Sequence, residues 1–294
     1  MSFPSPSSVR QPQRRYSRAR LAFFRTVEWT ARLLGGRRFY EFAFLSKGRF
    51  RLREEIVEVE GLPAALEGFT TAHWSDLHAG PFLREGGLRS LIEAVHERKP
   101  DLQVLTGDFV VHHADEARHL ACDLGELHAP HGCFAVFGNH DYKHRRENEI
   151  AELFASNVRF LRNSSVRLEL APGAVLALTG LEDLEEGKVV DLDAARSDLR
   201  EGDVEICLCH NPSGAAKIAR EGCALVLSGH SHGMQIDLPY LRHMGPHHPG
   251  SRVRYGSTEL IVSNGVGVVG LPLRFRVPAE VVLVKLRRAP EVST

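Results

Sequence analysis

Residues 70–78 read TTAHWSDLH, an apolar and β-branched run that ends in a serine, an aspartate and a histidine. Four further apolar runs end in polar motifs: TGD (106–108), GNHD (138–141), CHNP (209–212) and SGHSHG (228–233). Helical patterns separate these runs, and alternating strands and helices are typical of an α/β domain. Because α/β sheets bind ligands beyond the carboxyl ends of their strands, the five motifs indicate one functional site.

The hydrophobic pattern predicts the secondary structure around these motifs. Strands are expected at residues 56–59, 70–74, 103–106, 133–137, 175–179, 205–209, 224–227, 260–262 and 281–285. Helices are expected at residues 87–98, 115–128, 147–156, 193–200 and 212–221. Residues 236–256, rich in proline, glycine and histidine, are predicted to form a long loop of the kind that often carries function.

The composition is that of a soluble globular protein. The chain has 294 residues, enough for one large or two small domains, with 43% hydrophobic and 25% charged residues. No stretch approaches the roughly 18–20 uninterrupted apolar residues of a membrane-spanning helix. The five cysteines lie mostly in apolar runs, which argues against a disulfide framework. We therefore expect a reducing, cytoplasmic compartment.

The zero net charge hides a basic N-terminal segment. Residues 1–55 hold 13 Lys and Arg against 4 Asp and Glu, so residues 56–294 carry a net charge of −9. We divide the chain there, into a basic segment and a catalytic domain. Residues 1–15 read as a disordered lead, and residues 17–34 as an amphipathic helix. One arc of this helix carries Phe23, Phe24, Val27, Ala31 and Leu34, and the other side carries Arg18, Arg25 and Arg32.

This helix allows two interpretations. A cationic helix with aromatic residues can bind an anionic membrane surface, which would place the protein on the inner face of the cell membrane. Alternatively, the helix packs on the catalytic domain and its arginines remain in water.

The five motifs supply oxygen and imidazole ligands but no thiolate. Asp76 and His78 are two residues apart, which on an extended segment points both side chains the same way, and the same holds for His230 and His232. Seven candidate ligands are too many for one tetrahedral ion but suit two ions that share a carboxylate. Mixed carboxylate, amide and histidine ligands favour Mn²⁺, with Fe²⁺, Zn²⁺ or Mg²⁺ as alternatives.

The ordered set of D-x-H, GD, GNHD, H and GHxH resembles the calcineurin-like metallophosphoesterase superfamily over about residues 69–286. The sequence segments SDLHAG, LTGDFV, FGNHDY and SGHSHGMQ are similar to those of its bacterial YkuE/YaeI-like branch. This resemblance implies a four-layer αββα sandwich with two mixed β-sheets, in which the metals lie at one end.

The resemblance also implies residue roles. Asp108 would bridge two metals and serve both. His140 would protonate the leaving group after attack by a metal-bridging hydroxide, and Asp141 would orient the His140 ring. The remaining ligands would be Asp76, His78 and His232 on one metal, and Asn139, His210 and His230 on the other.

The implied substrates are phosphodiesters or pyrophosphates. The lipid A precursor UDP-2,3-diacylglucosamine is one such substrate, and a cationic amphipathic helix suits a lipid-linked molecule. The alternatives are a cyclic-nucleotide phosphodiesterase, a nuclease, a phosphomonoesterase and a non-catalytic scaffold. The negative charge of residues 56–294 argues against a nucleic-acid partner, and the complete ligand set argues against a scaffold. His112, His113 and His247 are candidate substrate contacts, or else solvated loop residues.

Overall fold

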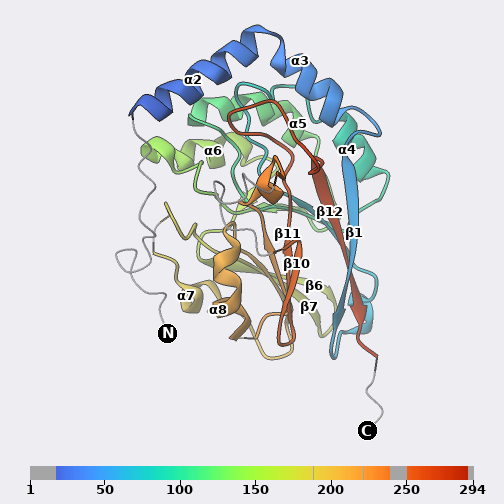
Figure 1. Cartoon of the computed structure of the whole chain (residues 1–294). Coiled ribbons are helices and arrows are strands. Elements are labelled where there is room, and N and C mark those ends of the chain that lie inside the picture. The colour runs from blue at the N-terminus through green and yellow to red at the C-terminus, as the bar shows by residue number, and fades with distance from the viewer. Residues whose placement is uncertain (1–17, 188, 221, 239–249, 291–294) are drawn as a thin grey trace.

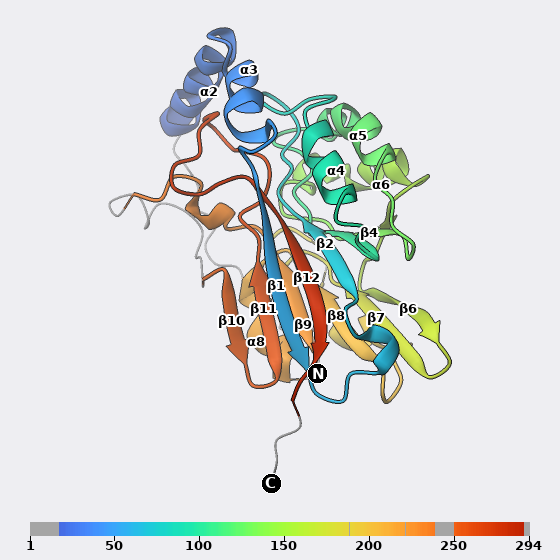
Figure 2. The ribbon, with the colours of Figure 1, turned by 90° about the vertical axis from the view of Figure 1, so that its right-hand side faces the viewer.

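Two six-stranded sheets lie face to face, with helices on the outer side of each (Figures 1 and 2). The structure is a computed structural model that describes residues 18–187, 189–220, 222–238 and 250–290. The predicted αββα sandwich is therefore confirmed, with both sheets mixed.

The first sheet combines both ends of the domain. Its strands lie in the order β1 (Arg51–Val59), β12 (Glu280–Arg288), β2 (Thr70–Trp74), β3 (Leu102–Leu105), β4 (Cys133–Ala135) and β5 (Arg159–Phe160). β12 runs parallel to β1 and antiparallel to β2, so the last strand of the chain is inserted between two early ones. β2 to β5 are parallel, which directs their carboxyl ends to one edge.

The second sheet has a parallel centre and antiparallel edges. Its strands lie in the order β10 (Arg252–Tyr255), β11 (Thr258–Val262), β9 (Leu225–Ser228), β8 (Val204–Leu208), β7 (Ala174–Gly180) and β6 (Ser164–Ala171). The four central strands run parallel, and the two edge strands run against them.

Three apolar cores fill the spaces between the four layers, because successive side chains of a strand point to opposite faces. In β12, Leu283 faces the outer helices α4 (Arg89–His96), α5 (Ala121–Gly125) and α6 (Glu147–Phe154), whereas Val282 lies between the sheets. In β8, Ile206 lies between the sheets and Cys207 faces α7 (Leu192–Ala195) and α8 (Ala215–Arg220). All five cysteines are free, as the sequence indicated.

The structure differs from the predicted elements in several places. β5, β6 and β10 were not predicted, and β10 lies within the expected loop at 236–256; residues 239–249 of that loop lie outside the described residues. The expected helix at 115–128 is a 3₁₀ helix, Ala114–Leu120, followed by the short α5. The expected helix at 193–200 is a single turn that begins after the Asp191 N-cap.

The N-terminal helices lie across one end of the sandwich (Figure 1). α2 (Arg18–Leu33) is followed by α3 (Gly36–Tyr40) and a π-helix, Glu41–Leu45. Tyr40 and Leu45 are buried in the core next to the first sheet, and β1 spans the expected division at residue 55. Leu34, expected on the apolar arc, is 83% exposed, whereas Ala31 of that arc packs against the core. None of the described helices is long and apolar enough to cross a bilayer.

Candidate metal centre

The five motifs follow five parallel strands, three in the first sheet and two in the second. Asp76, Asp108 and Asn139 come after β2, β3 and β4, and His210 and His230 come after β8 and β9. The carboxyl ends of these strands, from both sheets, therefore lie close together, and the side chains gather there, as expected for an α/β fold.

Five of the gathered residues have a left-handed backbone: Asp76, His78, Asp108, His230 and His232, with φ between 48° and 68°. The predicted extended geometry of the Asp76/His78 pair and of the His230/His232 pair is therefore wrong. Left-handed backbone is unfavourable for residues other than glycine, and it persists where the surrounding structure enforces it. Its concentration here marks a site where side-chain placement prevails over local backbone preference.

One cluster consists of Asp76, His78, Asp108 and His232, whose candidate ligand atoms all lie within 4.8 Å of one another. The Nε2 atom of His232 is 3.3 Å from Oδ1 of Asp76, and the Nε2 atom of His78 is 3.5 Å from Oδ2 of Asp108. Three of the four residues are buried, and His232 is partly exposed.

A second cluster shares Asp108 with the first and adds His210 and His230. The Asp108 oxygen that faces His78 also lies 3.4 Å from Nε2 of His210. The side-chain oxygen of Asn139 is 3.3 Å from His210 and 3.0 Å from His230. The structure thus brings together all seven predicted ligands, with Asp108 between the two groups.

The donor atoms fit bound cations. The Nε2 atoms of His78 and His232 lie 2.9 Å apart, while Nδ1 of His78 donates to the Val110 carbonyl at 3.1 Å. Because the proton is on Nδ1, Nε2 of His78 is unprotonated and its lone pair is free to bind a cation. Burial lowers the pKa of His78 to about 4 and that of His232 well below its usual value, so both rings are neutral at neutral pH. A cation would satisfy the facing nitrogens and the nearby carboxylates together.

Two glycines allow the strand ends to approach closely. A Cβ atom at Gly138 would lie 2.2 Å from an Asp108 oxygen, and one at Gly229 would lie 1.8 Å from the Ser75 hydroxyl. Side chains at either position would therefore displace the ligand-bearing loops.

Asp141 does not orient the His140 ring as predicted. Its carboxylate accepts hydrogen bonds from the backbone N–H groups of Asp108, Phe109 and Gly138, and so ties the β3 and β4 loops together. Burial, and then the Asp108 charge, raise the pKa of Asp141 to about 8. The His140 ring instead has its Nδ1 atom 2.9 Å from the Val111 carbonyl and 2.7 Å from Nζ of Lys143.

Two further residues at the site, Lys143 and Glu185, were not predicted from the sequence. Oε1 of Glu185 is 3.3 Å from Nε2 of His230 and accepts a hydrogen bond from Asn211 at 3.0 Å. Glu185 belongs to the acidic run LEDLEE that follows β7, so an acidic run after a predicted strand was the available signal. Lys143 lies two residues beyond the GNHD motif, where only the fold shows its contact.

The predicted substrate contacts are placed as follows. The half-buried His112 lies 3.1 Å from Glu28 of α2. His113 is exposed, and its ring stacks on His144 with the centroids 4.8 Å apart. His247 lies outside the described residues.

Comparison with known proteins identifies the family. The family model described as calcineurin-like phosphoesterase matches residues 69–234, which contain all seven gathered ligands. The chain belongs to this family. As a calcineurin-like phosphoesterase it is a metal-dependent phosphoester hydrolase.

Two relatives support the predicted branch. The chain is 30% identical to the uncharacterized metallophosphoesterase YkuE of Bacillus subtilis, over 83% of this chain and 88% of that protein. It is 33% identical to an uncharacterized metallophosphoesterase of Aquifex aeolicus, over 81% and 92%. It is also 31% identical to the UDP-2,3-diacylglucosamine pyrophosphatase LpxG of Chlamydia trachomatis, over 60% and 67%.

Proposed function

We propose that this phosphoesterase cleaves phosphodiester or pyrophosphate bonds with two divalent metal ions, of which Mn²⁺ is the expected species. The observation that carries this proposal is the single Asp108 oxygen, 3.5 Å from His78 of one cluster and 3.4 Å from His210 of the other. When bound, two such ions activate water and polarise the phosphoryl oxygens.

His140 is the proposed proton donor to the leaving oxygen. Burial lowers its pKa to about 3, so the ring is neutral at neutral pH and carries one proton. We assign that proton to Nε2, because Lys143 donates both to Nδ1 and to the Val111 carbonyl that faces it, at 2.7 Å each, so that Nδ1 is the acceptor. As Nε2 passes its proton to the leaving oxygen, the Lys143 ammonium supplies one to Nδ1, which leaves the ring neutral. Burial lowers the pKa of Lys143, which favours this transfer.

Leaving-group dependence tests this role. His140→Ala should lower kcat by about 10²–10⁴-fold on an alkyl phosphodiester, the usual contribution of a general acid. The loss should shrink on a nitrophenyl ester, whose leaving group needs no proton. Lys143→Met should show the same dependence. Equal losses on both esters would contradict proton donation, and would leave the two residues as phosphate-binding or structural groups.

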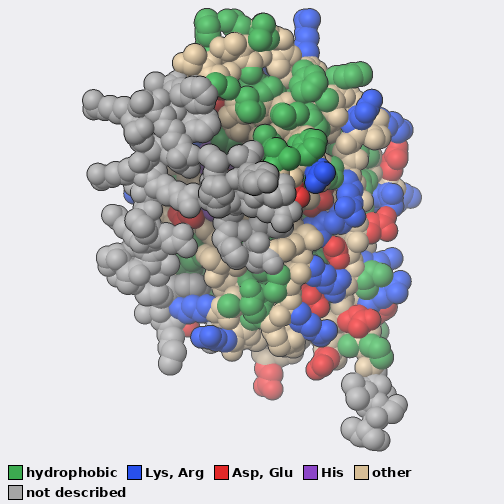
Figure 3. Space-filling view, in the orientation of Figure 1, with side chains coloured by type: hydrophobic (Ala, Val, Ile, Leu, Met, Phe, Trp, Pro, Cys, Tyr) green, Lys and Arg blue, Asp and Glu red, His purple; other side chains and the backbone are tan. Residues whose placement is uncertain are grey.

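A lipid-linked or nucleotide-sugar substrate such as UDP-2,3-diacylglucosamine is the proposed substrate class. Its support is the similarity to LpxG together with the surface above the site. Large apolar side chains are exposed along α2, α3 and the π-helix, where Figure 3 shows hydrophobic atoms gathered. These side chains are Trp29, Leu33, Leu34, Phe39 and Phe42, all at least 50% exposed, and we refer to them together as the apolar face.

The apolar face is the proposed contact with an anionic membrane surface, which would place the protein on the inner face of the cell membrane. Arginines accompany it: Arg25, Arg32 and Arg38 are exposed, and the Arg49 guanidinium lies 6.0 Å from the Phe42 ring centroid. Aromatic residues beside arginines are typical of segments that bind at the lipid headgroups.

Vesicle sedimentation tests the membrane contact. Replacing Trp29, Leu34 and Phe42 by serine should release the protein from vesicles containing phosphatidylglycerol, whereas Leu153→Ser on α6 should not. Truncation of the segment is a poorer test, because Tyr40 and Leu45 belong to the core. Unchanged sedimentation of the triple variant would refute the membrane contact.

A substrate screen with Mn²⁺ separates the remaining functions. Turnover of UDP-2,3-diacylglucosamine above that of a cyclic nucleotide, a DNA strand and a phosphomonoester would support the proposed substrate. Preference for any of those three would identify the corresponding alternative. Absence of any turnover with metal bound would indicate a scaffold.

A further inference from the structure

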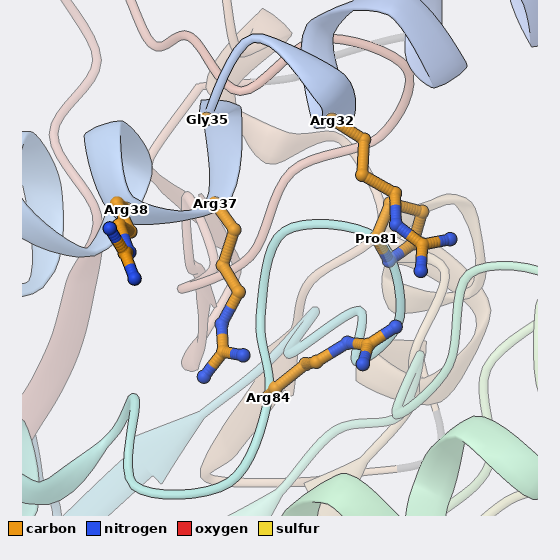
Figure 4. Close-up of a pocket in the computed structure, with 6 residues that line it drawn as sticks. All are labelled: Arg32, Gly35, Arg37, Arg38, Pro81 and Arg84. Carbon is orange, nitrogen blue, oxygen red and sulfur yellow. The ribbon is translucent and has the colours of Figure 1, made fainter.

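A pocket lined by four arginines lies between the N-terminal helices and the loop that follows β2. Its volume is about 310 Å³, and Figure 4 shows its lining. Arg32 from the end of α2 and Arg84 from the loop point into the same space beside Pro81, and Arg37 of α3 extends toward Arg84. The lining is completed by Arg38 and by Gly35, which turns the chain between the two helices.

The positive charge of this arginine pocket is largely uncompensated. Arg37 pairs with Glu41 at 2.9 Å, and Nε of Arg84 donates to the Gly80 carbonyl at 3.3 Å. Within the described part of the chain, Arg32 and Arg38 have no carboxylate partner. An adjoining pocket shares Arg37 and Arg84 and adds Arg89 and His119, against a single carboxylate, Glu85. Like charges gathered in this way repel one another, so a bound anion would stabilise the arrangement.

The arginine pocket lies at the same end of the fold as the metal centre. Arg84 is six residues beyond the ligand His78, a span of at most about 20 Å even for an extended chain. The actual distance is shorter than this limit, because the loop turns back on itself: the Gly80 N–H donates to the Leu83 carbonyl at 3.0 Å. Helix α2, which supplies Arg32 to the pocket, also approaches the metal centre. Its Glu28 contacts His112, and the carbonyl of the neighbouring residue Val111 contacts His140.

We propose that the arginine pocket binds a phosphate-bearing group, either a phosphate monoester or a diphosphate, at a site separate from the metals. Arginine suits such a ligand because its planar guanidinium makes paired hydrogen bonds to phosphate oxygens. The pocket volume of about 310 Å³ accommodates a phosphate or diphosphate group. Two sources share this chemistry: the headgroup of a lipid in the bilayer, and a soluble diphosphate. This anion site is additional to the proposed hydrolysis, and it is tested by measuring ligand binding and not turnover.

The experiment uses the full chain loaded with Mn²⁺ and two probes. Methylenediphosphonate, which is not hydrolysed, is titrated by calorimetry, and vesicles of phosphatidylcholine with and without phosphatidic acid are sedimented. The variants are Arg84→Gln and Arg38→Gln. Arg220→Gln, which removes an exposed arginine at the end of α8, is the matched control. Arg38 is exposed and unpaired among the described residues, so its variant should keep the wild-type fold and melting temperature.

Each outcome decides the proposal. A soluble ligand predicts two classes of diphosphonate site in the wild type, one of them weakened about tenfold or more in both pocket variants. A lipid ligand predicts instead a loss of similar size for Arg84→Gln, which is not part of the proposed membrane contact, in sedimentation with phosphatidic acid vesicles only. If both pocket variants match Arg220→Gln in both assays, the pocket is not an anion site. A protein that binds the probes but hydrolyses nothing would contradict the proposed function and leave this inference intact.

Discussion

Gly138→Ala should disable the metal centre without changing any ligand. The added Cβ would lie 2.2 Å from Oδ1 of Asp108, 2.6 Å from the Asp108 backbone nitrogen and 2.7 Å from Cε1 of His210. One of these atoms belongs to the backbone, so rotation of a side chain does not relieve the clash. The loop after β4 must move away from the loops after β3 and β8.

The required movement sets the size of the effect. Ordinary van der Waals contact begins at 3.4 Å, so Asp108 and the β4 loop must separate by roughly 1 Å. A misplacement of about 1 Å costs on the order of 10²-fold in rate. Overpacking of this kind also costs about 1–3 kcal/mol of stability. We therefore expect a loss of kcat of about 10²-fold or more, at least one metal ion lost, and a melting temperature lower by several degrees.

Elemental analysis, kinetics and calorimetry of the same preparation measure these three quantities. Gly125→Ala is the matched control: its Cβ would meet nothing within 4 Å, and its position in α5 makes alanine neutral or stabilising. If Gly138→Ala keeps two metals and wild-type kcat, the close approach of the loops is not needed and this reasoning is refuted.

Three further predictions concern Asp108, His73 and Arg53. Asp108→Asn should weaken both metals, because one carboxylate serves both clusters; elemental analysis that shows one ion retained at full occupancy would contradict this. Burial, and then Arg53, lower the pKa of His73 to about 3, against 6.5 in the unfolded chain. As the pH falls from 7 to 5, this histidine therefore takes up a proton in the unfolded chain but not in the folded one. The free energy of unfolding should fall by about 2 kcal/mol over this pH range. Urea titrations of His73→Gln should show a pH dependence smaller by that amount. Arg53→Met should cost about 3–5 kcal/mol by leaving Glu280 buried without its ion pair, and adding Glu280→Gln should recover part of this loss.

The centre of the site could be predicted from the sequence because each ligand is tied to a local signal. Asp76, Asp108 and His230 directly follow apolar runs that form buried strands, and topology brings the ends of parallel strands together. The buried strands were likewise recognisable from their apolar residues, since both of their faces are covered.

What escaped prediction depends on weak patterns or on tertiary contacts. β6 does alternate, with Val166 and Leu168 on one face and Arg167 on the other, but all of its residues are only partly buried or exposed, as at a sheet edge. The role of Asp141 depended on which backbone amides lie within reach. The arginine pocket joins helices α2 and α3 to a loop about 50 residues further along the chain, and no local pattern indicates such an encounter.

The insertion of β12 between β1 and β2 has a consequence for biosynthesis. β1 pairs with β12 over nine residues and has no other neighbour among the described strands, so β1 has no partner in the sheet until β12 has been synthesised. Contacts so distant in sequence form slowly. While the ribosome still holds the final residues, β1 and β2 each present an open edge, which is the condition under which nascent chains aggregate. A premature stop codon even a few residues before position 280 would leave that exposure permanent, although every metal ligand had already been translated.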